Sequence, residues 1–160
     1  MSPETLAFLR LLPVLSSTAI LMFAFDEYLF LSRFMNPTYR NESNAFLAKW
    51  FTQWLAKAKF VIITLFPFSL GTALANIFTS RSALQAAGAE KWYWCGFAFQ
   101  FAHFLFAPIA IKLLNEVCED KPKGEVTGTM GKWLKMHLVR SVVVDVGAWV
   151  FFIVGNVMAR

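Results

Sequence analysis

The chain has 160 residues, of which 58% are hydrophobic, 17% aromatic and only 16% charged, and its mean hydropathy is +0.53. A soluble domain of this size with so few polar side chains has too little polar surface to cover itself, which excludes an ordinary soluble globular protein. The formal net charge of +5 comes from basic residues that gather in particular connections, so no nucleic-acid partner is expected.

Four long apolar runs account for the composition. They are Leu6–Phe30, Phe60–Phe78, Trp92–Leu114 and Leu138–Met158. Each is close to the ~20 residues that an α-helix needs to cross the hydrocarbon core of a bilayer. None alternates with a period of two, so helices rather than barrel strands are expected. The sequence therefore predicts one all-α integral membrane domain over residues 1–160, built as a four-helix bundle.

The segment between the first two runs is amphipathic. Residues 44–59 read NAFLAKWFTQWLAKAK, with Trp50 and Trp54 on one helical face and Lys49 and Lys57 on another. Two interpretations stay open, a helix lying at the headgroup level and a cytosolic extension of the second span. Because indole rings prefer the membrane interface, membrane anchoring is favoured over substrate gating for the two tryptophans.

Basic residues concentrate in the first and third connections, and eleven of the fifteen lie there: Arg33, Arg40, Lys49, Lys57, Lys59, Lys112, Lys121, Lys123, Lys132, Lys135 and Arg140. The positive-inside rule then places these connections in the cytosol and both termini across the membrane, in the lumen if the organelle is the endoplasmic reticulum. The first run lacks a basic leader and a small-residue cleavage site, so a retained helix is expected. Residues 118–132 are expected to form a flexible hairpin without chemistry.

Ionisable side chains share one face of the fourth run. On a helical wheel His137, Arg140 and Asp145 fall within an arc of about 140°, and valines occupy the opposite side. The third run places Gln100 and His103 on one face, and the first run carries Glu27. Such groups are costly in a membrane and usually functional. We therefore expect these faces to converge on a shared chamber in the cytosolic half of the bundle.

The candidate catalytic residues are His103, His137, Arg140, Asp145 and Glu27. The candidate substrate-binding residues are Asp26, Gln100, Phe23, Phe99 and Trp149. A neutral buried histidine suits a general base, whereas a purely structural interhelical hydrogen bond is the simpler alternative for His103. Arg140 and Asp145 are five residues apart, which is awkward for a pair on one α-helix, so a partner for Arg140 from the first span is expected.

Other site chemistries lack their motifs. Two histidines and a carboxylate would suit non-haem iron, but the spacing of its motifs is missing and we expect no metal. There is no nucleophile elbow and no glycine-rich phosphate loop, so a serine hydrolase and a nucleotide cofactor are not expected. No cofactor is predicted, and the oligomeric state is left open.

Two stretches resemble a known family. WLKMHLVRSVVVDVGAW (133–149), with Trp133, His137 and Arg140, and SSTAILMFAFDEYLF (16–30) are similar to the fungal anthrone oxygenase-like family of small four-helix membrane proteins. These proteins occur in gene clusters for aromatic polyketides and meroterpenoids. The resemblance implies a cofactor-free monooxygenase that converts an anthrone to an anthraquinone, in which a histidine takes the substrate proton and Arg140 stabilises the enolate oxygen.

Two other functions remain open for the same cavity. One is a cofactor-free acid–base isomerase or cyclase of a lipophilic metabolite, with aromatic rings stabilising cationic intermediates. The other is a scaffold or small-molecule carrier that uses its polar faces only for packing. In each case the expected partners are a lipophilic small molecule and the lipid bilayer.

Overall fold

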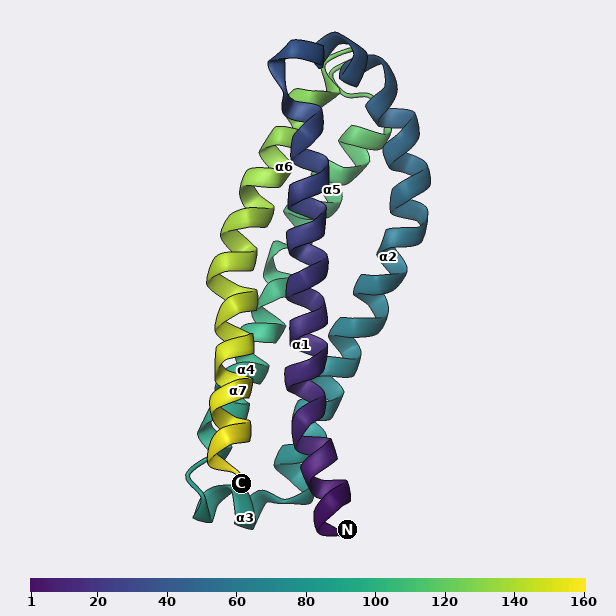
Figure 1. Cartoon of the computed structure of the whole chain (residues 1–160). Helices are drawn as coiled ribbons and strands as arrows, with labels where there is room; N and C mark the ends of the chain where they lie inside the picture. Colours follow the sequence, from purple (N-terminus) through teal and green to yellow (C-terminus); the bar gives the residue numbers. More distant parts are fainter.

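The computed structural model describes residues 1–160, and they are helical almost throughout, with no strand (Figure 1). The helices are α1 (Pro3–Leu31), α2 (Arg40–Thr79), α3 (Arg81–Ala86), α4 (Glu90–Ala102), α5 (Ala107–Cys118), α6 (Val126–Arg140) and α7 (Val146–Met158). Short 3-10 turns cover Ser32–Met35, Pro37–Tyr39 and His103–Phe106, and a π-helical turn covers Ser141–Asp145. The all-α fold class is confirmed.

Four helical segments are long and apolar enough to cross a membrane: Pro3–Met35, Pro37–Thr79, Glu90–Cys118 and Val126–Met158. Many large apolar side chains on them point outward; Phe25, Ile63 and Val142 are each more than half exposed. Contiguous apolar surface of this kind indicates contact with lipid rather than water.

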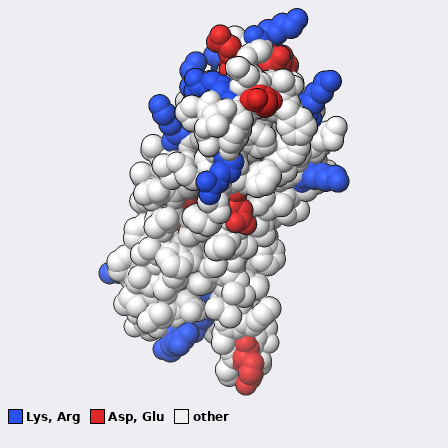
Figure 2. Space-filling view, turned by 45° about the horizontal axis from the view of Figure 1, so that its top comes forward, with Lys and Arg blue, Asp and Glu red and all other residues white.

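The four segments run lengthwise beside one another (Figure 1). Contacts join α1 to α2, α2 to α4, α4 to α7, α5 to α6, and α7 back to α1, so the segments close into a four-membered bundle. Both termini and α3 lie at one end, and the connections 32–39 and 119–125 form the other. Figure 2 shows Lys and Arg gathered around the end with these connections, above a broad uncharged belt.

The core consists of two hydrophobic clusters, one toward each end. The cluster near the connections 32–39 and 119–125 contains Leu31, Leu47, Phe51, Val117, Val126, Met130, Trp133 and Leu134. The cluster near the termini contains Ala73, Ile77, Leu84, Ala89, Tyr93, Ala148, Phe152 and Ala159. Most of the buried ionisable side chains lie between the two clusters, which is why the site is found at intermediate depth.

The amphipathic segment is an extension of the second span, which decides between the two interpretations left open. α2 is one helix of 40 residues, so it is about 60 Å long, twice the ~30 Å thickness of a hydrocarbon core. Its apolar part from Phe60 to Thr79 matches that thickness. The part before Phe60 therefore projects beyond the hydrocarbon and carries the exposed Lys49 and Lys57.

The predicted flexible hairpin at 118–132 is wrong over its second half, because α6 begins at Val126 despite Gly128 and Gly131. Val126 and Met130 are fully buried in the core, and this burial offsets the low helix propensity of glycine. The helix start is also capped from another span, since the backbone N–H of Thr127 donates to Oδ1 of Asn44 at 2.9 Å.

Candidate functional site

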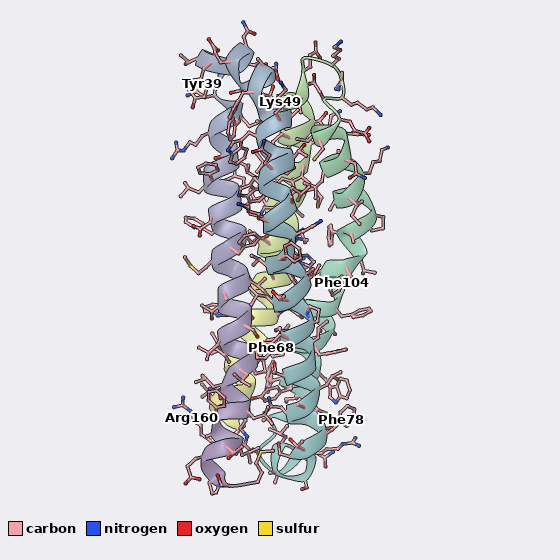
Figure 3. The ribbon with its side chains drawn as sticks, turned by 90° about the vertical axis from the view of Figure 1, so that its right-hand side faces the viewer. Tyr39, Lys49, Phe68, Phe78, Phe104 and Arg160 are labelled. Carbon is pink, nitrogen blue, oxygen red and sulfur yellow. The ribbon has the colours of Figure 1, made fainter.

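His103 lies where the third span departs from α geometry, in the 3-10 turn His103–Phe106 between α4 and α5. Pro108 explains the break, because proline donates no backbone hydrogen bond and its ring clashes with the carbonyl four residues earlier, at Phe104. The imidazole is buried, and its centre lies 3.9 Å from the ring centre of Phe66 on α2. The neighbouring Phe104 is about midway along the molecule (Figure 3), so His103 lies at mid-bundle.

A second departure from α geometry occurs in the fourth span, where the π turn Ser141–Asp145 separates α6 from α7. Its wider ring is closed by the N–H of Val146, which donates to the carbonyl of Ser141. In an α-helix, Arg140 and Asp145 would be about 140° apart around the axis. The π turn brings them to one face, and Arg140 Nε lies 3.7 Å from Asp145 Oδ2. This pairing replaces the partner from the first span that the α-helical wheel suggested for Arg140.

Asp145 connects the two irregular turns. His103 Nδ1 donates a hydrogen bond of 2.9 Å to Asp145 Oδ1, and both side chains are buried. The other carboxylate oxygen, Asp145 Oδ2, and the facing Arg140 Nε are buried without a hydrogen-bond partner. Unpaired buried polar atoms are costly, so this position favours binding of a polar group.

His137 is held through both of its ring nitrogens. Arg140 Nη2 lies 2.7 Å from His137 Nδ1, and since a guanidinium only donates, this nitrogen is an acceptor. His137 Nε2 lies 3.0 Å from the carbonyl oxygen of Ala24 on α1, so Nε2 carries the hydrogen and donates it. The imidazole is therefore a neutral, fixed tautomer, and it stacks on Trp133 with ring centres 4.7 Å apart.

Glu27 completes the group of ionisable side chains. It is only 6% exposed, and its Oε2 lies 3.8 Å from His137 Nε2. We call the set Glu27, His103, His137, Arg140 and Asp145 the ionic cluster; it is supplied by α1, by the 3-10 turn after α4, by α6 and by the π turn. Three of the four spans thus meet at one buried site, as the helical wheels suggested.

A groove of about 580 Å³ opens between α1 and α2 beside Glu27. This aromatic groove is lined by Phe23, Asp26, Glu27, Leu29, Phe30, Arg33, Trp50 and Trp54. Trp54 stacks on Trp50 with ring centres 6.1 Å apart and lies parallel to Phe23 at 6.5 Å. Its volume is within the range of small-molecule sites, and Glu27 is the member of the ionic cluster that lines it.

The aromatic groove lies beside the start of the apolar part of α2. Trp54 precedes Phe60, the start of the apolar part of α2, by six residues, which is about 9 Å of helix. Tryptophan is enriched at this level of membrane proteins because its ring is amphipathic. The aromatic groove therefore adjoins the apolar surface of the second membrane-length segment.

Curated relatives match the chain over nearly its full length. It is 41% identical over 151 residues to "Probable epoxidase scpX" of Mollisia scopiformis, covering 94% of this chain and 95% of that protein. It is 34% identical over 154 residues to "Epoxidase pydX" of Acremonium sp, covering 96% and 95%, and 34% over 155 residues to "Epoxidase gkaX" of Penicillium citrinum, covering 97% and 96%. The chain belongs to this family of fungal epoxidases.

Membership of the fungal epoxidase family agrees with the resemblance to anthrone oxygenase-like proteins and supports an enzyme of oxygenation chemistry in fungal secondary metabolism. A more distant relative, 25% identical over 147 residues and covering 89% of this chain and 84% of that protein, is "Oxaleimides biosynthesis cluster protein N" of Penicillium oxalicum. No family model matches the chain, and no solved structure matches it.

The structure separates the predicted substrate-binding residues into two groups. Phe23 and Asp26 line the aromatic groove with Glu27. The remaining three lie elsewhere: Gln100 pairs with Ser69 at 3.5 Å, Phe99 packs against Gly147 and Phe151, and Trp149 donates to Thr18 at 2.9 Å. Their contacts are those of helix packing.

Several residues of the site were not identified from the sequence. Trp50 and Trp54 were assigned to membrane anchoring, although their shared helical face was visible. Arg33 and Phe30 are not predicted as site residues, because a helical wheel does not show which face of a neighbouring helix it meets. The structure contains no group of three or more His, Cys, Asp or Glu side chains arranged to hold a metal ion.

Proposed function

We propose that the chain is an epoxide-forming oxygenase whose substrate is a lipophilic hydroquinone held in the aromatic groove. The observation that carries this proposal is the position of Glu27. Its carboxyl group lines an aromatic groove at the membrane edge and also belongs to a buried ionic cluster. The family of named epoxidases supports the oxygenation chemistry.

The charges of the ionic cluster indicate that it binds one additional proton. Two carboxylates, Glu27 and Asp145, accompany one guanidinium, Arg140, and His137 is neutral in its fixed tautomer. A buried cluster is most stable when its net charge is zero, which requires one additional proton. Glu27, which is buried, and His103, which is hydrogen-bonded to Asp145, can each hold that proton, and Glu27 is a free carboxylate when His103 holds it. The geometry therefore favours Glu27 as the group that faces the substrate, with His103 and Asp145 behind it.

In the proposed reaction, Glu27 takes a proton from the substrate's hydroxyl group or activated C–H. The resulting electron-rich carbon transfers electrons to dioxygen and forms a C–O bond, giving a peroxide. The carbon-bound peroxide oxygen bonds to the adjacent conjugated carbon and the O–O bond breaks, so the epoxide forms. The second oxygen atom leaves as water, with one proton from Glu27 and one from the remaining hydroxyl group of the substrate, which becomes a carbonyl. The substrate supplies all the electrons: a hydroquinone and O₂ give a quinone epoxide and water.

The anthrone oxygenation implied by the family resemblance shares the first steps of this scheme. There the peroxide has no adjacent conjugated carbon to attack, and it loses water to give a carbonyl group, so an anthrone and O₂ give an anthraquinone and water. The same groove and base serve both reactions, and the substrate decides the product.

An isomerase or cyclase is the second candidate function. The walls of the aromatic groove favour it, since Phe23, Trp50 and Trp54 present π faces that stabilise a cationic intermediate. Glu27 would then donate a proton instead of accepting one. Oxygen consumption separates the two functions.

The test uses membranes that contain the full chain, with an alkyl hydroquinone and anthrone as probes and isotopically labelled dioxygen. We expect one O₂ consumed per product, with one labelled atom in the product and one in water. Glu27→Gln should lower turnover by about 10²–10⁴-fold, the usual contribution of a positioned acid or base.

The matched control is Glu42→Gln, which removes the same charge from an exposed position at the start of α2 and should leave turnover unchanged. A loss below about tenfold for Glu27→Gln would contradict the role of this carboxylate. Conversion of a probe without oxygen uptake would favour the isomerase.

A further inference from the structure

A second groove, on the other side of α1, is lined by basic side chains. This basic groove has a volume of about 520 Å³ and lies between the end of α1 and α6, with Arg40, Lys132 and Lys135 on its walls. No acidic residue lines it, and none of the three basic residues makes an ion pair within the molecule. The hydroxyl groups of Ser32 and Thr127 add further hydrogen-bonding groups.

Two glycines leave the basic groove open. A Cβ atom on Gly128 would meet nothing within 4 Å, and one on Gly131 would meet only the sulfur of Met35, at 3.6 Å. At these two positions the wall of α6 is therefore backbone, and Lys132 and Lys135 lie beside it. The groove thus has room for an anionic group among three unpaired cations.

An apolar cavity adjoins the basic groove on the side toward mid-membrane. It has a volume of about 330 Å³ and lies between α1 and the region of the π turn, lined by apolar side chains that include Met22, Phe25 and Val142. Tyr28 and Leu138 line both spaces, so the two adjoin at these side chains. Leu138 is also the first residue of the apolar run that ends at Met158, so the change from basic to apolar lining occurs at the edge of the hydrocarbon layer.

The dimensions and polarity of the combined space match one lipid molecule. Lys132 and Val146 are 14 residues apart, which corresponds to about 21 Å along the helices. One leaflet contributes ~15 Å of hydrocarbon plus its headgroup, so the length fits a single phospholipid. We propose that the basic groove and the apolar cavity together bind one anionic phospholipid, with its phosphate and acidic headgroup on Arg40, Lys132 and Lys135 and an acyl chain along Met22 and Val142.

The charge and the location identify this occupant. Each basic residue near a membrane surface attracts anionic lipid by about 1 kcal/mol, and three unpaired ones act here on the same site. Met22 and Val142 are 55% and 59% exposed at hydrocarbon depth, where an acyl chain is the available partner. A soluble acidic peptide would satisfy the cations but would leave the apolar cavity uncovered.

Such a lipid would contact the ionic cluster at His137, on the side away from the aromatic groove. The apolar cavity is also lined by His137 and by Ser141, whose hydroxyl group is buried without a hydrogen-bond partner. A bound acyl chain would pack against the interface between α1 and α6, where His137 donates a hydrogen bond to the carbonyl of Ala24. We therefore expect the lipid to stabilise the bundle, whatever reaction the aromatic groove supports.

The test measures lipid retention by native mass spectrometry and the thermal unfolding midpoint of the full chain in detergent. Phosphatidylserine should remain bound and raise the midpoint, and phosphatidylcholine should do neither. The variant R40Q/K132Q/K135Q should bind phosphatidylserine at least tenfold more weakly and lose the rise in midpoint. Circular dichroism should show that it keeps its helical content, because the three side chains are exposed.

The matched control, K49Q/K57Q/K59Q, removes three exposed charges from α2 outside the basic groove and should bind phosphatidylserine as the unmodified chain does. Glycerophosphoserine, which has the headgroup without acyl chains, should not raise the midpoint. Equal binding of phosphatidylcholine, an equal loss in both triple variants, or a full effect of the headgroup alone would overturn the proposal.

Discussion

His137 and His103 are both buried histidines in the ionic cluster, but their surroundings give them different capacities. Both ring nitrogens of His137 are engaged, one by Arg140 and the other by the carbonyl of Ala24. His103 has a single hydrogen bond, through Nδ1 to Asp145, and its other nitrogen is unbonded. A proton can therefore be added to His103 without breaking a contact, whereas protonation of His137 must displace Arg140.

Asp145 offers the clearest residue-scale prediction. Asp145→Asn keeps the size of the side chain and an oxygen for His103, but it removes one negative charge, so the cluster no longer requires an additional proton. Glu27 remains a carboxylate in this variant, so turnover should fall by less than in Glu27→Gln while the chain stays folded, measured with the labelled-oxygen assay and the thermal unfolding midpoint in detergent.

Asp145→Leu provides the comparison, because it leaves Arg140 buried without its partner. It should lower the free energy of unfolding by about 3–5 kcal/mol, which calorimetry or a denaturation curve detects. If Asp145→Asn retained full turnover, a charge-based role would be wrong; if Asp145→Leu were as stable as the unmodified chain, the ion pair would not matter.

At the residue scale the sequence predicted which polar side chains face inward but not what they meet. Helical periodicity predicts the faces that carry Glu27, His103 and Arg140. Because a charge that faces lipid is costly, these faces are predicted to point into the bundle. The partners depend on the backbone: Arg140 meets Asp145 only through the π turn, which has no reliable sequence signal. The aromatic groove was missed because it exists between two helices, whereas the sequence describes one helix at a time.

The long helices are the elements that hydropathy predicts well, and the interruptions within them are the elements that carry function. Pro108 in the third span is a readable signal for the turn at His103, although hydropathy alone predicts one continuous helix there. Nothing comparable marks Ser141–Asp145. The early start of α6 was also unreadable, since it depends on burial of Val126 and on a cap from Asn44 of another span.

The π turn can be tested by deletion. A π turn holds one residue more than the α-helical turn it replaces, so deleting the lipid-facing Val143 should restore an α-helix with the flanking faces unchanged. Arg140 and the aspartate would then be four residues apart, about 40° around the axis, and still paired. We expect the unfolding midpoint to change by less than about 4 °C, the shift of a ~1 kcal/mol change in a chain of this size.

Deleting Val150 is the matched control, because it is also exposed but lies within the regular helix α7. That deletion rotates the rest of α7 by about 100°, turns Phe152 out of the core and should prevent folding, seen as loss of a monodisperse peak in size-exclusion chromatography. An equal loss of folding in the two deletion variants would show that the π turn does not tolerate the removal of one residue.

Across the whole molecule, the end formed by the connections 32–39 and 119–125 carries most of the basic side chains (Figure 2). We propose that this end faces the cytosol and that both termini lie in the lumen of the endoplasmic reticulum. The aromatic groove and the basic groove then both belong to the cytosolic side of the membrane, where anionic lipids are enriched.

Glycosylation tests this orientation. Asn41-Glu42-Ser43 has the form of an acceptor site at the start of α2, on the proposed cytosolic side, and should carry no glycan. An acceptor tripeptide placed in a short extension before Met1 should be modified, which a mobility shift sensitive to glycosidase detects. A glycan on Asn41, or none on the extension of a well-expressed chain, would invert the orientation.

The two hydrophobic clusters have a further consequence for the membrane. A bundle with charged groups at intermediate depth would conduct ions if water reached those groups from both ends. Here Phe51, Met130 and Trp133 close the bundle on one side of the charges, and Tyr93 and Phe152 close it on the other. The two clusters therefore separate the ionic cluster from both ends of the bundle.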